Sequence, residues 1–95
     1  MRGVDLAIYA DALAGEAAAL GARAERARGR LRQEAIERRA RLELTSVAVE
    51  RLQGLGLLNE IDEAATRAEL RELEAALDAL EELQSWVEGE LASAA

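Results

Sequence analysis

Apolar residues recur through the first part of the chain at steps that alternate between four and three. Leucine and alanine share these positions, which are Leu6, Ala10, Leu13, Ala17, Leu20, Ala24, Ala27 and Leu31. This spacing places the side chains on one helical face, as at the a and d positions of a coiled coil. Beyond Leu31 we expect the stripe to drift through Ala35 to Leu42, because a straight helix departs from a seven-residue repeat. The pattern predicts a long helix at about residues 4–44.

The pattern changes after Leu44. Thr45, Ser46 and Val47 bring β-branching and an N-cap candidate, so we expect a break or kink near residue 45 and a short helix at about residues 46–53. Glycines then signal a helix end, followed by an apolar turn at about residues 54–59. This turn contains three leucines, which we expect to plug the end of a helical bundle: Leu55, Leu57 and Leu58.

A second long helix is predicted at about residues 60–92. Its a and d positions are occupied by Leu70, Leu73, Leu77, Leu80, Gln84, Val87 and Leu91. The start of this helix has three candidates. Thr66 and Glu69 match a capping box, and Asn59 or Asp62 could equally cap the first turn.

Charges are distributed unevenly along the two long helices. Residues 26–41 contain seven arginines and two acids, whereas the chain from Glu60 onward contains eleven acids and two arginines. On a helical wheel the arginines flank the apolar stripe on both sides, as e and g residues do. Each exposed ion pair contributes at most about 1 kcal/mol, so we expect these charges to select partner and register. The register-setting set comprises Arg23, Arg26, Arg30, Arg32, Glu74, Asp78 and Glu81.

The composition predicts an all-α protein that supplements a thin core by assembly. Much of the 51% apolar content is alanine, and only two aromatic residues occur in 95 residues. We expect one domain, a long antiparallel helical hairpin with a short middle helix, which assembles into a dimeric bundle or coiled coil. The predicted interface seam is formed by Leu6, Leu13, Leu20, Leu31, Leu70, Leu73, Leu77 and Leu80. Trp86 and Tyr9 lie off this seam and are candidates for a contact with a partner.

The sequence offers little catalytic chemistry. It contains no His, no Cys and no Lys, so imidazole bases, thiol nucleophiles and the usual zinc ligands are excluded. We therefore expect no enzyme activity, no catalytic or metal-binding residues and no cofactor. The net charge of −7 argues against a general attraction to nucleic acid or anionic membranes. Asp5 and Asp11 fall where a signal peptide needs an apolar core, so a cytoplasmic location is expected.

These observations favour a non-catalytic oligomerisation or adaptor protein, most simply a homodimer, with another helical protein as the other partner considered. One alternative is a nucleic-acid-associated accessory protein that uses the segment Arg23–Arg41. A second alternative is a metal-dependent all-α phosphohydrolase on the acidic helix, because carboxylates three residues apart share a helix face. The pairs with that spacing are Glu60 with Glu63 and Glu69 with Glu72.

Overall fold

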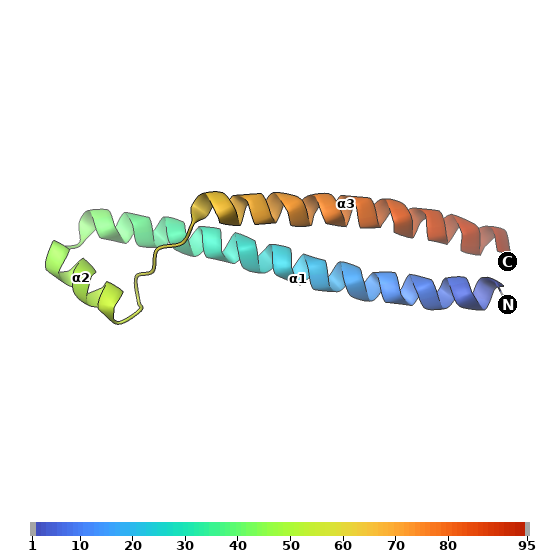
Figure 1. Ribbon diagram of the computed structural model, residues 1–95, viewed down its shortest axis with the longest axis horizontal. Helices are drawn as coiled ribbons and strands as arrows, with labels where there is room; N and C mark the ends of the chain where they lie inside the picture. Colours follow the sequence, from blue (N-terminus) through green and yellow to red (C-terminus); the bar gives the residue numbers. More distant parts are fainter. Residues whose placement is uncertain (1, 95) are drawn as a thin grey trace. The chain divides into compact units, whose positions relative to one another are not determined.

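The protein is all-helical in the computed structural model, which describes residues 2–94 and the side chains of residues 3–94 (Figure 1). Three helices follow one another along the chain, and no strand occurs in that range. Helix α1 spans Arg2–Glu43, α2 spans Ser46–Gly54 and α3 spans Glu63–Ala94. The absence of proline and the many alanine, leucine, glutamate and arginine residues, all strong helix formers, account for the length of α1 and α3.

The chain forms two compact units, each of which combines part of α1 with part of α3. Unit 1 contains the residues up to Glu25 and those from Arg71 onward, and unit 2 is Arg26–Leu70. Within unit 2 the two helices run antiparallel, because Arg30 pairs with Glu69 and the later Arg38 pairs with the earlier Glu63.

Unit 1 has the same antiparallel arrangement. One small hollow is lined by the α1 residues Ala10 and Leu13 together with the α3 residue Val87. Another is lined by the earlier α1 residue Leu6 and the later α3 residue Glu90. Within this unit, residues earlier in α1 therefore lie beside residues later in α3, so the two helices run in opposite directions.

Both ends of α2 are fixed by local hydrogen bonds. Thr45 is the N-cap, and its Oγ1 accepts from the backbone N–H of Ala48 at 3.2 Å. At the other end Leu57 N–H donates to the Leu52 carbonyl at 2.9 Å, and Gly56 N–H donates to the Gln53 carbonyl at 3.0 Å. This pair of bonds is a Schellman motif, which needs a left-handed residue, and Gly56 supplies it with a φ of 73°.

Helix α3 begins three residues later than the pattern predicts. Of the three candidate starts, Asp62 is the one that caps the helix, because its Oδ1 accepts from Ala65 N–H at 3.0 Å. Asn59 instead stabilises the preceding turn by donating from its side-chain amide to the Gly56 carbonyl at 2.8 Å. The carboxylate of Asp62 at the N-cap also interacts favourably with the positive end of the helix dipole.

The core is small and lies mainly along the contact between α1 and α3. Its buried apolar side chains are Leu13, Ala24, Ala27, Leu58, Leu73 and Val87. Alanine in two of these layers lets the helices approach closely, but it removes little apolar surface from water. The packing within the chain therefore provides only limited hydrophobic stabilisation.

Two sequence-based expectations are wrong in unit 2. The stripe does not drift to Leu42, which is 83% exposed; Glu34 and Glu37 are buried instead. Glu34 lies at the next heptad position after Leu31, whereas the following heptad position is occupied by exposed Arg38 and its neighbour Glu37 is buried. The leucines of the turn do not all plug a bundle end either, because only Leu58 is buried whereas Leu55 and Leu57 are 67% and 62% exposed.

Candidate interaction surfaces

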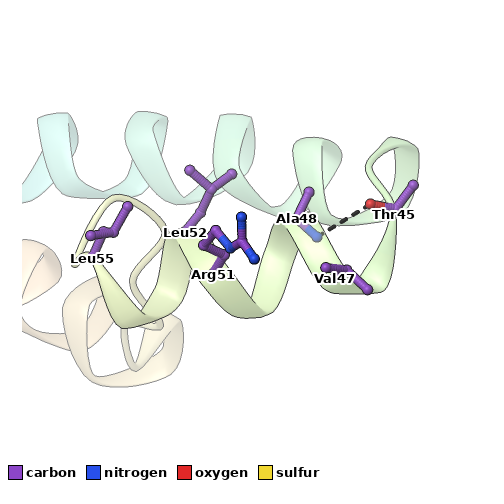
Figure 2. Close-up of a pocket in the computed structure, with 6 residues that line it drawn as sticks. All are labelled: Thr45, Val47, Ala48, Arg51, Leu52 and Leu55. Carbon is purple, nitrogen blue, oxygen red and sulfur yellow. Dashed lines mark hydrogen bonds between the residues drawn. The ribbon is translucent and has the colours of Figure 1, made fainter.

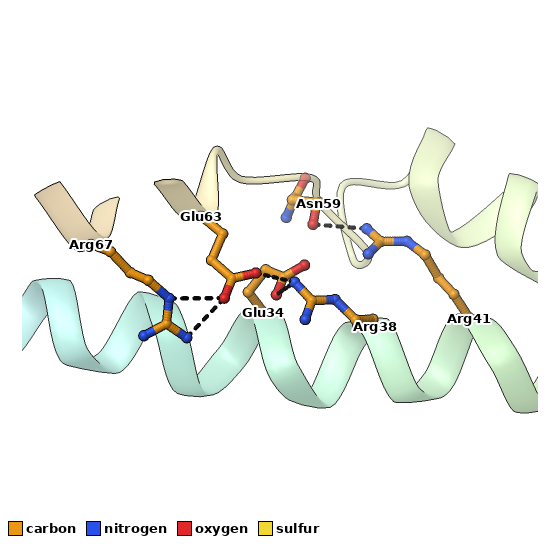
Figure 3. Close-up of polar contacts among 6 residues, drawn as sticks. All are labelled: Glu34, Arg38, Arg41, Asn59, Glu63 and Arg67. Carbon is orange, nitrogen blue, oxygen red and sulfur yellow. Dashed lines mark hydrogen bonds and ion pairs between the residues drawn. The ribbon is translucent and has the colours of Figure 1, made fainter. Parts of the chain in front are cut away.

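The contact between α1 and α3 in unit 2 is made largely by charged side chains (Figure 3). Arg38 bridges Glu34 on its own helix, at 2.6 Å, and Glu63 at the start of α3. Glu63 also accepts from Arg67 at 2.8 Å, so two guanidinium groups converge on one carboxylate. Arg41 extends the row by donating from Nη2 to the Asn59 carbonyl at 2.8 Å. These contacts define the direction in which α3 packs.

The charges in this row stabilise one another's ionised forms. The hydrogen bond from Arg38, assisted by that from Arg67, holds the pKa of Glu63 below its ordinary value. The hydrogen bond to Glu63 and the charge of Glu34 raise the pKa of Arg38 in turn. Because Arg38, Glu63 and Arg67 remain at least partly accessible to solvent and only Glu34 is buried, the row contributes more to register than to stability.

Helix α2 presents an open apolar groove (Figure 2). The groove has a volume of about 340 Å³ and is lined by Thr45, Val47, Ala48, Arg51, Leu52 and Leu55. None of the residues of α2 is buried, and Val47 is 65% exposed. The sequence predicts this helix but not its exposed face, for which the i, i+4, i+7 spacing of Ala48, Leu52 and Leu55 is the available signal.

Unit 1 exposes both of its aromatic side chains and is rich in acidic residues. Trp86 of α3 is 57% exposed and Tyr9 of α1 is 43% exposed. Val4 and Ile8, one helical turn apart, are both more than 60% exposed. Unit 1 contains eleven acidic residues and three arginines, whereas unit 2 contains eight acidic residues and nine arginines. The two units therefore differ strongly in charge.

All eight residues of the predicted seam lie on faces that are at least partly covered. Leu13 and Leu73 are buried, and the other six have intermediate exposure. The intermediate group comprises Leu6, Leu20 and Leu31 of α1 and Leu70, Leu77 and Leu80 of α3. The helix pair within the chain thus covers these leucines incompletely, and their role in assembly stays a prediction.

The predicted register-setting charges have several environments. Arg30 pairs with Glu69 at 2.9 Å, which is a different acid from those expected. Asp78 and Glu81 line an open acidic hollow on α3. The remaining members are all exposed to solvent: Arg23, Arg26, Arg32 and Glu74.

The described residues also bear on a metal site and on a membrane span. Among residues 2–94, no group of three or more His, Cys, Asp or Glu side chains is arranged so that it could hold a metal ion. The carboxylate of Glu63 is engaged by arginines, and Glu69 pairs with Arg30. No helix in the described part of the chain is both long and apolar enough to cross a membrane.

The chain matches no family model, and neither a curated protein nor a solved structure is similar to it.

Proposed function

We propose that this protein is a non-catalytic helical association module that acts as a homodimer. In this proposal α1 and α3 form one antiparallel hairpin, and two hairpins pair about a two-fold axis into a helical bundle. The half-covered leucines of α1 and α3 carry the proposal, because such residues are normally removed from water completely in a helical bundle.

The exposed surface of the chain supports this proposal quantitatively. The accessible surface is 6931 Å² for a mass of 10.2 kDa, whereas a monomeric globular protein of that mass exposes about 5,300 Å². The excess is about 1,600 Å² per chain. Stable homodimers bury about 1,000–2,500 Å² per partner, so one dimer interface accounts for an excess of this size.

The absolute mass in solution tests the proposal directly. Light scattering on a sizing column should give twice the chain mass both at low salt and at about 0.5 M salt, because apolar burial is not screened. A monomer under both conditions would contradict self-association and would indicate that a different protein covers the leucines.

Leu20→Glu tests the seam. Leu20 is only partly covered within the chain, so a carboxylate there meets the partner rather than the chain's own core. We expect the variant to be monomeric, because a buried carboxylate without a partner costs several kcal/mol. Ala19→Glu is the matched control, since Ala19 is exposed on the same helical turn. A dimer of unchanged mass and melting temperature for Leu20→Glu would exclude the seam assignment.

A further inference from the structure

We infer that Trp86 of one copy packs into the α2 groove of a second copy, an inference that rests on the proposed self-association. Four of the six residues that line the groove are apolar, and two of these, Val47 and Leu55, are more than 60% exposed. Trp86 is the single tryptophan of the sequence and is 57% exposed. Tryptophan is among the residues most enriched at the centres of protein interfaces, where it fills an apolar pocket.

The need of α2 for a partner supports this contact. An isolated helix of nine residues is marginal in water, and packing of its apolar face normally stabilises it. Within the chain no residue of α2 is buried, and Val47 and Leu55 are both more than 60% exposed. Insertion of an indole between these side chains would provide the missing burial.

Charge complementarity identifies the occupant as a second copy. Trp86 belongs to unit 1, in which acidic residues outnumber arginines by eleven to three. The groove belongs to unit 2, which holds nine of the twelve arginines, and Arg51 lines the groove itself. Glu82 and Glu90 lie one turn on either side of Trp86, on the same face of α3. Both are exposed, so either can reach Arg51 of the other copy.

Two-fold symmetry gives this contact twice in each dimer. Unit 1 of each copy lies on unit 2 of the other, so that acidic surfaces meet arginine-rich surfaces at both places. An arrangement with like units together would bring two surfaces of eleven acids each into contact. The inference therefore specifies antiparallel pairing of the two copies.

The fluorescence of Trp86 reports on this contact directly because no other tryptophan contributes. We expect the emission of the wild-type protein to shift to shorter wavelength as concentration rises through the range in which light scattering shows dimer formation. Val47→Glu should remove this shift and raise the dimer dissociation constant at least tenfold. Ser46→Glu is the control, since Ser46 is exposed in the same first turn of α2 but does not line the groove.

The outcomes separate this inference from the proposed function. A dimer in which Trp86 emits at long wavelength, unchanged by Val47→Glu, would overturn the Trp86 contact while self-association stands. A chain that stays monomeric at every concentration would overturn both. Circular dichroism of Val47→Glu should differ from the wild type by no more than the nine residues of α2, which would show that α1 and α3 stay folded when the contact is lost.

The orientation has an independent readout because the sequence contains no cysteine. Single cysteines at Ser46 and at Ser85, which adjoin the groove and Trp86, can be joined by a short bismaleimide. A mixture of the two variants should give cross-linked heterodimers and few cross-linked homodimers. A preference for homodimers would show parallel pairing and overturn the inference.

Discussion

Glu63 illustrates how a single side chain defines the packing of α3 in unit 2. It lies at the first position of α3 and accepts hydrogen bonds from Arg38 of α1 and Arg67 of its own helix. The polar row around it includes buried Glu34, so the contact depends on ionised partners rather than on apolar burial. Loss of one charge in such a row leaves the remaining charges without compensation.

The lowered pKa of Glu63 predicts an acid-sensitive contribution to stability. A carboxylate with a lowered pKa in the folded state stabilises the fold above its ordinary pKa of 4.5, and this contribution is lost as pH falls through the folded value. The melting temperature of the wild type should therefore fall more steeply below pH 4.5 than that of Glu63→Gln. Thermal unfolding followed by circular dichroism at a series of pH values measures this difference. Glu72→Gln, at an exposed position of α3, should retain the steep wild-type profile.

At the scale of the elements, the end of α2 depends on the backbone of one glycine. Gly56 has a φ of 73°, a conformation that a residue with a Cβ adopts at a cost of about 1–2 kcal/mol. Gly54 is the last residue of α2 and has no atoms near the position of an added Cβ, so alanine there should gain a part of the helix propensity of about 0.5–1 kcal/mol that applies in a helix interior. Gly56→Ala should lower the melting temperature and Gly54→Ala should raise it, at equal protein concentration. Equal shifts for the two variants would contradict the left-handed cap.

The elements themselves could largely be predicted from the sequence, whereas the faces they present could not. Three helices follow from composition and from the a and d spacing, which depend only on local residues. Beyond Leu31 the sequence predicts a stripe that drifts through Ala35 to Leu42, because a straight helix departs from a seven-residue repeat. In the structure Ala35 and Leu42 are exposed and Glu34 is buried instead. Arg38 pairs with both Glu34 and Glu63, the first residue of α3. The α2 groove depends on tertiary packing and has only a weak local signal.

At the scale of the whole molecule, the two units differ in their charge and in the side chains that they expose. Unit 1 leaves leucines half covered and carries most of the acidic excess, whereas unit 2 packs through charges and exposes large apolar side chains. The exposed apolar side chains of unit 2 are Ile36, Leu42, Leu44, Val47, Leu55 and Leu57. The two units thus differ most clearly in charge, and pairing of unlike units in two identical chains would bring acidic and arginine-rich surfaces together.

This complementarity predicts that the stability of the protein depends on its concentration. If much of the apolar burial occurs between copies, the folded dimer is favoured by mass action, and the melting temperature should rise by several degrees over a hundredfold increase in concentration. Differential scanning calorimetry over that range measures the dependence. Leu20→Glu should melt at a lower temperature that no longer changes with concentration, because a variant that does not dimerise gains no stability from a higher concentration. A wild-type melting temperature independent of concentration would mean that each chain is stable alone, and that the half-covered leucines contribute little to folding.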